Sequence, residues 1–444
     1  MQREVAQEVE SLLAVIFAGR RQSGRLDLEA VEMATRAALH RAGAGMLEEL
    51  LATDDEFSRQ VPCRCGQAAR YHEMRPKQLL TVLGRVETER PYYVCAHCQR
   101  GQSPRDQELD VVGSEYSPGV RRMMGLVGSE SSFAQGREQL ELLAAREVTP
   151  KAVERQAEAL GMEIAAREQV EIQPALELEL PPVKGPEIPV LYIELDGTGV
   201  PMVASETEGR AGKEGEQARP REAKLGCVFT QTTVDAKGRP LRDEASTTYS
   251  GGIETADAFG PRMYREAGQR GWRRAKKKVV LGDGAVWIWN LADEHFPGSI
   301  QIVDLYHARQ HLWDLAGKLW ATEEGQRQRW TKKLQRKLDG GKIESLVKEL
   351  RFLPPPTPKA AELLRLEADY FARNAPRMRY PEFRRQDLFV GSGVIEAGCK
   401  TVIGSRLKRS GMFWTVRGAN AILALRCHRL SGKFQDYWEN RRCA

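Results

Sequence analysis

The chain has 444 residues, of which 41% are hydrophobic and 29% are charged, and its formal net charge at pH 7 is +6. This length exceeds what one hydrophobic core usually organises, so we expect a soluble protein of about two to four domains. No run of the sequence is apolar for long enough to span a bilayer, and Glu4 and Glu8 interrupt the place of a signal peptide, which argues against a membrane or secreted protein and predicts a cytoplasmic one.

Residues 1–58 are expected to form an N-terminal helical module. The segments VAQEVESLLAVI (5–16) and LEAVEMATRAALHRA (28–42) both repeat apolar residues at helical spacing. This pattern predicts helices that pack or dimerise, and it assigns no chemistry to the module.

Residues 59–112 carry two close cysteine pairs, separated by the strand-like segments LLTVLG and RVETERPYYV. The pairs are Cys63 with Cys65, and Cys95 with Cys98. Two such pairs flanking a β-hairpin are how a zinc ribbon presents four thiolates in a tetrahedron, so we expect a structural Zn²⁺ here. The first pair is one residue closer than usual, and His72 or His97 could replace one thiolate. Free buried cysteines or a disulfide are the alternatives, the disulfide being disfavoured in a reducing cytoplasm.

Residues 113–171 are expected to form a helical, helix-turn-helix-like region. A first helix follows Ser117 and Pro118, and the last begins after Thr149, a favoured N-cap residue. Lys151 and Arg155 on that last helix could enter a DNA major groove. An ordinary helical hairpin is the alternative. Residues 172–187 are rich in proline and are expected to be an extended linker.

Residues 188–318 are strand-rich and carry three aspartates after apolar runs. IPVLYIELD ends at Asp196, VVLGD at Asp283 and SIQIVD at Asp304. Asp196 read alone could simply open a turn at the following glycine. Three antiparallel strands, a helix, then strand–helix–strand is the order of a ribonuclease-H-like α+β core, a mixed sheet with helices on both faces. In that fold the first and fourth strands are neighbours, so Asp196 and Asp283 would share Mg²⁺ ions that relieve their repulsion.

Residues 319–386 form a charged, helical segment that we interpret as an all-α insertion. Residues 387–444 then carry Glu396 near the start of a helix, followed by a basic tail, and we expect Glu396 to be the third metal ligand. An ordinary ion pair between Glu396 and Lys400 is the alternative. The basic residues expected to bind phosphates are Lys400, Arg406, Lys408, Arg409 and Arg417. Trp313 and Trp414 could stack on an unpaired base, although core packing is the favoured role for both.

The motifs LDGTGVPM around Asp196, LGDGAVWIWNLADEHFPGSIQIVDLYH around Asp283 and GSGVIEAGCKTVIGSRLKRSGMFW around Glu396 resemble the transposases of ISKra-type bacterial insertion sequences. These belong to the wider group of Asp-Asp-Glu recombinases that includes the Mutator-like enzymes. The resemblance covers residues from about 60 to the C-terminus, with the cysteine ribbon included. Asp304 and His307 resemble an Asp/Cys-x-x-His element that supports the active site or contacts DNA in related transposases; a purely structural His307 is the alternative.

The resemblance implies a DNA transposase whose catalytic residues Asp196, Asp283 and Glu396 bind two Mg²⁺ ions, with Mn²⁺ as an alternative ion. Hydrolysis at the end of the element would leave a 3′-hydroxyl that then attacks target DNA. The implied partners are double-stranded DNA, both element ends and target, and a second copy in a homodimer on DNA, within the bacterial nucleoid. The alternatives are a ribonuclease-H-like nuclease without strand transfer and a non-catalytic, transposase-derived DNA-binding protein.

Overall fold

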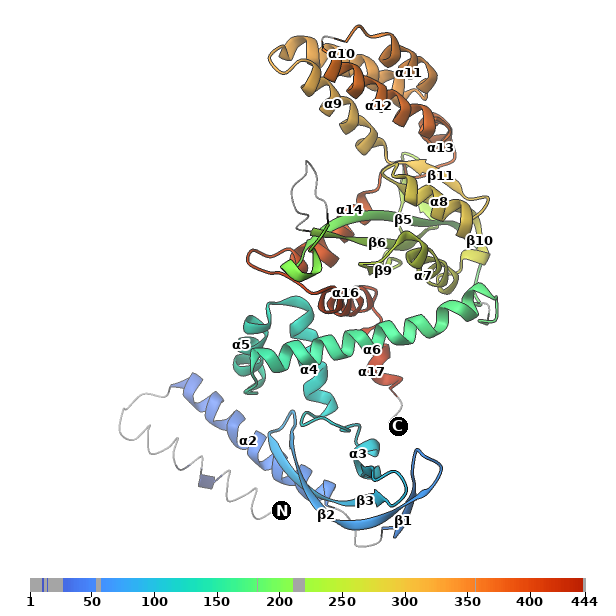
Figure 1. Ribbon diagram of the computed structural model, residues 1–444. Helices are drawn as coiled ribbons and strands as arrows, with labels where there is room; N and C mark the ends of the chain where they lie inside the picture. Colours follow the sequence, from blue (N-terminus) through green and yellow to red (C-terminus); the bar gives the residue numbers. More distant parts are fainter. Residues whose placement is uncertain are drawn as a thin grey trace. The chain divides into compact units, whose positions relative to one another are not determined.

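The computed structural model describes residues 27–52, 57–181, 183–210, 220–355 and 357–441, together with Glu10, Ser11 and Ala14. The chain divides into two compact units, which are Met1–Ala157 with Asp436–Ala444, and Glu158–Gln435 (Figure 1). The helix expected over residues 5–16 lies almost wholly outside the described residues. Within the described ranges, no helix has the length and apolar character needed to cross a membrane.

The first unit consists of a long helix, a small sheet and a helical region. Its elements are α2 (Leu28–Leu51), β1 (Gln60–Pro62), β2 (Ala68–Leu80), β3 (Arg85–Cys95), β4 (Gly101–Gln102), α3 (Pro104–Glu108), α4 (Pro118–Glu130), α5 (Phe133–Ala144) and the start of α6 (Pro150–Leu176). The four strands form one antiparallel sheet in the order β1-β2-β3-β4. Helix α2 lies against the long β2–β3 hairpin (Figure 1) and packs Ala44, Leu47 and Leu51 against the hairpin's buried Leu79 and Val86.

Helices α4, α5 and α6 pack around a small core. Met124 and Leu140 meet Val153 of α6 there, and the side chains of Ser117 and Ser132 cap the two preceding helices. Helix α6 runs to Leu176, so the first five residues of the expected linker 172–187 are helical. Burial of Ile172 and Ala175 stabilises these last turns despite Pro174 inside the helix.

The second unit is built on a five-stranded mixed sheet in the order β11-β10-β5-β6-β9. Its strands are β5 (Ile188–Pro201), β6 (Pro220–Gln231), β9 (Thr248–Gly252), β10 (Ala275–Gly282) and β11 (Ile300–Val303). Strand β5 is antiparallel to β6, and β6 to β9, whereas β5, β10 and β11 run parallel. The first and fourth strands of this sheet in chain order, β5 and β10, are therefore neighbours, as the order of elements predicted.

Helices cover both faces of this sheet, which explains the unbroken apolar runs of β5 and β10. Gly226 packs against Met263 of α7 on one face, and Gly282 packs there against Ile288 of α8. Leu225, the residue before Gly226, points to the other face, where it lies against Gly398 of α14, and Gly251 of the neighbouring strand β9 packs there against Leu423 of α16. The helical elements of this part of the unit are α7 (Ala256–Gln269), α8 (Val286–His295), α14 (Gly393–Gly398), the π-helical turn η5 (Cys399–Gly404), α15 (Ser405–Leu407) and α16 (Val416–Leu430). The last helix, α17 (Phe434–Glu439), begins at the end of this unit and belongs mostly to the first one.

A helical segment follows β11, and Figure 1 shows its helices gathered in one lobe. It comprises α9 (Leu305–Leu319), α10 (Glu324–Asp339), α11 (Ile343–Phe352), α12 (Pro358–Asn374), η4 (Ala375–Met378) and α13 (Tyr380–Arg385). Helix α9 was expected in the core before the insertion at 319–386, but it packs against α10 and α12. We call this segment the helical insertion. The returning chain is tied to the sheet, because the Tyr192 hydroxyl accepts a bond from the Phe389 N–H (3.1 Å) and Gln231 donates to the Asp387 carbonyl (2.8 Å). Smaller elements are η1 (Ala204–Glu206), the hairpin β7 (Thr233–Val234) with β8 (Pro240–Leu241), and η3 (Trp272–Arg274).

Candidate functional site

Two aspartates lie side by side at the centre of the large sheet. The last paired residues of the parallel strands β5 and β10 are Leu195 and Gly282, and Asp196 and Asp283 are the next residue on each strand. Neighbouring strands are about 4.8 Å apart, so the two carboxylates leave the sheet at the same place. Asp196 does not open a turn, because β5 continues beside β6 to Pro201. The turn interpretation of Asp196 is therefore wrong.

The helix that carries Glu396 is fastened to the same place by its neighbours. The N–H of Ile395 donates to Oε2 of Glu194 on β5 (2.9 Å), and the Cys399 thiol donates to Oδ2 of Asp196 (3.3 Å). Gly398 permits this approach, since a Cβ there would lie 2.7 Å from the ring of Tyr249. We call Glu194, Asp196, Asp283, Asp304 and Glu396 the acidic edge.

Asp304 connects three segments of the acidic edge. It is fully buried, its N–H donates to the Gly282 carbonyl (2.8 Å), and its Oδ1 caps α9 by accepting from the His307 N–H (2.5 Å). Its Oδ2 accepts from the N–H of Ser392, just before the Glu396 helix. These bonds hold the end of β10, the start of α9 and the segment before α14 together. His307 is half-buried, and its charge acts on Asp196.

The electrostatics of the acidic edge are those of crowded carboxylates. Burial raises the pKa of Asp196, and the charge of Asp283 adds to this, while bonds from Cys399 and Gly197 oppose it. Burial also raises the pKa of Glu194 to about 8, with the charges of Asp304 and Glu396 contributing. The Oε1 atom of Glu194 has no hydrogen-bond partner. A site of this kind gains stability from a cation.

The helical insertion also reaches the acidic edge. The Tyr370 hydroxyl on α12 donates to the Asp283 carbonyl (2.9 Å), and the Tyr370 ring stacks on His311 at 4.1 Å. Gly284 has a φ of +101°, and a Cβ there would lie 2.7 Å from the Tyr370 ring. The turn after β10 is thus shaped to fit the insertion.

The residues expected to contact DNA differ in exposure. Exposed are Lys151, Arg155, Lys400, Lys408 and Arg417, whereas Arg409 and Trp313 are half-buried. Lys151 forms an ion pair with Glu154 (2.7 Å), and Lys408 donates to Thr198, two residues after Asp196 on β5. The structure shows no ion pair between Glu396 and Lys400, which was the alternative interpretation of that pair.

Arg406 and Trp414 are buried, so neither offers a surface to DNA, which was the role expected of Arg406 and one of two considered for Trp414. Arg406 is fully buried, with its guanidinium 5.0 Å from the centre of the Trp414 ring. The Trp414 indole is 7% exposed and donates to the Leu407 carbonyl (3.1 Å). Both side chains pack inside the unit, so core packing, the favoured role for Trp414, is the one observed.

A π-helical turn follows the Glu396 helix and explains another buried arginine. A π-helix leaves carbonyl groups without their usual α-helical partners. Arg426 of α16 donates to the carbonyls of Thr401 and Val402 and to the Ser405 hydroxyl (2.9 Å). Arg426, one of the basic residues of the C-terminal segment, therefore stabilises the interior of the fold and is buried away from the surface.

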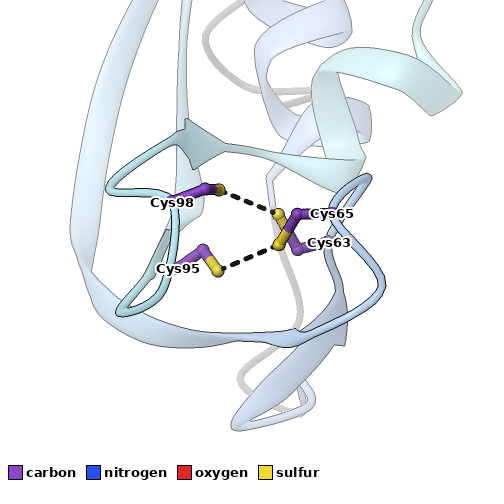
Figure 2. A group of neighbouring side chains, drawn as sticks. All are labelled: Cys63, Cys65, Cys95 and Cys98. Carbon is purple, nitrogen blue, oxygen red and sulfur yellow. Dashed lines mark hydrogen bonds between the residues drawn. The ribbon is translucent and has the colours of Figure 1, made fainter.

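The four cysteines of the ribbon come together, as predicted, and form the second candidate site (Figure 2). Cys63 and Cys65 lie in the turn after β1, and Cys95 and Cys98 lie at the end of β3. Sγ of Cys63 is 3.6 Å from Sγ of Cys98, and Sγ of Cys65 is 3.6 Å from Sγ of Cys95. A tetrahedral zinc site with bonds of about 2.3 Å has sulfur atoms about 3.8 Å apart.

Among the described residues, these cysteines alone form a group of three or more metal-ligating side chains with all ligand atoms within 4.8 Å. The short spacing of the first pair is accommodated by a tight turn, in which the Gly66 N–H donates to the Cys63 carbonyl and Gly66 has a φ of +82°. Neither His72 nor His97 belongs to the group, and the described cysteines are all free thiols. The acidic edge is not gathered as tightly as this.

Backbone N–H groups prepare the cysteine cluster for a cation. The N–H groups of Cys98 and His97 point at Sγ of Cys95 and lower its pKa to about 6. The N–H of Gln67 favours the Cys65 thiolate, but burial and the neighbouring sulfurs outweigh it and raise the pKa of Cys65 to about 11. A bound metal ion would favour the thiolate form of both groups.

An apolar cavity of about 290 Å³ lies elsewhere in the second unit. It is lined by the end of α6 and the residues after it, by α7 and by η3, and its lining includes Leu178, Tyr264 and Trp272. No residue of the acidic edge lines this cavity, so the cavity and the clustered carboxylates are separate features.

Three residues of the site were missed from the sequence. Glu194 stands two residues before Asp196 and so points to the same face of the sheet, a signal that period-2 alternation could have provided. Cys399 lies three residues after Glu396, which places both on one side of a helix. Tyr370 belongs to the insertion, and no local pattern connects it with Asp283.

The comparisons with known proteins are sparse. No family model matches the chain. Over 358 residues it is 23% identical to a Streptococcus gallolyticus protein called "UPF0236 protein in vanSb 3′ region", a match that spans 76% of this chain and 69% of that protein. The chain is also similar to a solved structure titled "Drosophila P element transposase strand transfer complex", at 11% identity and a TM-score of 0.19, over 56% of this chain and 66% of that one. The first name states no activity, and the second likeness is too low to carry an argument.

Proposed function

We propose that this protein is a DNA transposase with a ribonuclease-H-like catalytic core, in which Asp196, Asp283 and Glu396 are the catalytic residues. One observation carries the proposal: the register of β5 and β10 sets two aspartates next to each other, and the Glu396 helix is bonded to the same strand. The resemblance of these three motifs to ISKra-type transposases supports the same residues.

The residues fit divalent magnesium by their chemistry. All three offer carboxylate oxygens, which Mg²⁺ prefers, and the raised pKa of Asp196 reflects burial and a neighbouring negative charge that a cation would neutralise. Two ions divide their ligands between them, so the three carboxylates need not converge on one point. Bound Mg²⁺ would supply activation of the attacking oxygen and stabilisation of the leaving one.

The other residues of the site hold and orient this set. Glu194 and Asp304 fasten the chain before and within α14, and the Cys399 thiol orients the Asp196 carboxylate. The exposed side chains of Lys400, Lys408 and Arg417 are available to phosphates of the DNA backbone, which gives affinity and little sequence information. Lys151 and Arg155 would read the element end, and two copies would join on DNA.

We also propose that the cysteine cluster binds a structural Zn²⁺. The support is the sulfur spacing of 3.6 Å in both cross pairs and the N–H groups aimed at Cys95. Four thiolates leave no open coordination position, so this ion would stabilise the ribbon and take no part in the reaction.

The test is a cleavage and joining assay with purified protein, a labelled element end, a target plasmid and Mg²⁺. We expect Mg²⁺-dependent nicking and joined products, and we expect Asp283→Asn to lose both activities while it still binds DNA. Asparagine keeps the oxygen that accepts from the Ala285 N–H (2.8 Å), so the turn survives and only a metal-binding charge is lost.

Asp257→Asn is the matched control, because Asp257 is an exposed acid in the first turn of α7. It should cut and join at the wild-type rate. Cleavage without joining would support the ribonuclease-H-like nuclease, and binding without any cleavage would support the non-catalytic DNA-binding protein. Normal cutting by Asp283→Asn would refute the catalytic assignment.

A further inference from the structure

The helical insertion carries an uneven distribution of charge. Helix α10 has six basic residues against two acidic ones, whereas α11 has two of each and α12 has three of each. The surplus positive charge of the three helices therefore lies on α10 alone. The six basic residues are Arg327, Arg329, Lys332, Lys333, Arg336 and Lys337.

Half of these cations are neutralised inside the insertion. Arg327 is 3.9 Å from Glu324, and Glu349 of α11 lies 2.8 Å from Lys333 and 2.6 Å from Lys337. The other three, Arg329, Lys332 and Arg336, are exposed, and the described part of the insertion offers them no carboxylate within ion-pair distance. We call these three residues the α10 stripe.

The α10 stripe is aligned on the solvent side of the helix. At 3.6 residues per turn, its members fall within a sector of about 60°. The buried side chains Trp330, Leu334 and Leu338 face the opposite direction, into the insertion. From Arg329 to Arg336 the helix rises about 10 Å, a length over which duplex DNA presents several phosphates.

We propose that the α10 stripe is a second DNA-binding surface, which contacts the phosphate backbone of the duplex on which the acidic edge acts. Like charges on one face of a helix repel each other and destabilise the helix. Binding of a polyanion such as DNA would remove this repulsion, so three aligned cations without an ion-pair partner in the insertion suit a DNA-binding surface. The helical insertion would then serve to hold DNA as well as to support Asp283 through Tyr370. The inference rests on the proposed function for the identity of its partner.

The test compares two triple variants of the full-length protein for binding to a labelled duplex of random sequence. Arg329→Gln, Lys332→Gln and Arg336→Gln remove the stripe and keep good helix formers. Lys342→Gln, Lys348→Gln and Lys359→Gln remove the same charge from exposed, scattered positions of the same insertion. Binding is measured from about 50 to about 200 mM salt, with circular dichroism and thermal melts as folding checks.

We expect the stripe variant to bind more weakly to every sequence and to lose about 2 to 3 from the slope of log affinity against log salt, since each phosphate contact contributes about 0.9. The control variant should lose less than about 1. Equal slopes for the stripe variant and the wild type, or equal losses in both variants, would overturn the proposal.

Mg²⁺-dependent nicking by the wild-type protein separates this inference from the proposed function. Wild-type nicking with an unchanged slope in the stripe variant rejects the stripe alone. A reduced slope without wild-type nicking retains the DNA-binding surface and rejects the transposase. A wild-type protein that does not bind DNA rejects both.

Discussion

Glu194 is the residue of the acidic edge with the most demanding surroundings. It is fully buried on a central strand, one carboxylate oxygen has no partner, and the other accepts the N–H of Ile395. Burial of a carboxyl group without a cation partner costs free energy unless hydrogen bonds compensate for it. Here it satisfies a backbone N–H at the start of α14, where a helix has no internal acceptors. Glu194 therefore positions Glu396 without belonging to the proposed ligand set.

Replacing Glu194 by leucine and by glutamine separates this role from simple packing. Leucine leaves the Ile395 N–H buried without an acceptor, which costs about 1–3 kcal/mol. We expect Glu194→Leu to need more Mg²⁺ for half-maximal nicking and to nick more slowly at saturation. Glutamine keeps an acceptor oxygen, so Glu194→Gln should stay near wild type. A Mg²⁺ titration of the nicking rate checks this, and equal defects in the two variants would contradict it.

At the residue scale, the proposed ligands could be predicted and their supports could not. Asp196, Asp283 and Glu396 each stand out against their local pattern, as a carboxylate after an apolar strand or near a helix start. The bond between Cys399 and Asp196 joins residues 203 positions apart, and no local pattern of the sequence connects them. Arg406 was expected to bind phosphates at the surface, because a sequence shows a charge and not the aromatic ring of Trp414 that lies next to it.

The turn after β10 makes a close contact with helix α12. Gly284 combines a φ of +101° with a Tyr370 ring that occupies the space of a side chain. The same ring stacks on His311, and His311 Nδ1 lies 2.8 Å from Glu367 of α12. The insertion and the strand end are thus built against each other.

Gly284→Ala should lower the free energy of unfolding by more than the backbone strain of a positive φ alone would cost. Strain at such a φ costs about 1–3 kcal/mol, and the clash with Tyr370 adds to it. Gly298 is the matched control, since its φ is +76° and nothing lies within 4 Å of a Cβ built there. We expect Gly284→Ala to reduce the free energy of unfolding more than Gly298→Ala does, as measured by denaturant titration. Equal losses would show that the Tyr370 ring moves away freely.

At the element scale, strand order was more predictable than element length. The adjacency of β5 and β10 followed from the order of strands and helices, and the two cysteine pairs predicted the ribbon. Strand β5 extends five residues beyond Asp196 because β6 continues to pair with it, and α6 extends five residues into the expected linker because Ile172 and Ala175 are buried. Both extensions depend on tertiary partners that a local pattern does not contain.

The whole molecule consists of two compact units whose stability has different sources. The second has a five-stranded sheet covered on both faces by helices. At the cysteine end of the ribbon, the cluster of buried residues has four members, and two of these, Cys63 and Cys95, belong to the cysteine cluster. Such a small core rarely folds without additional help, and a bound structural Zn²⁺ contributes its binding free energy to folding.

Removing zinc should therefore destabilise one unit and spare the other. Seven of the eight tryptophans lie in Glu158–Gln435, so tryptophan fluorescence reports mainly on that unit, while far-ultraviolet circular dichroism reports on both. We expect a strong chelator, or Cys95→Ser, to release one zinc per chain and to move an early circular-dichroism transition to lower temperature. Neither treatment should change the temperature of the fluorescence transition, whereas Gly284→Ala, which lies in the second unit, should lower it. A chelator that shifts both signals together would mean that the two units unfold as one. A protein that purifies without zinc would refute the metal assignment, because the four cysteines, with sulfur atoms 3.6 Å apart in each cross pair, would then hold no ion.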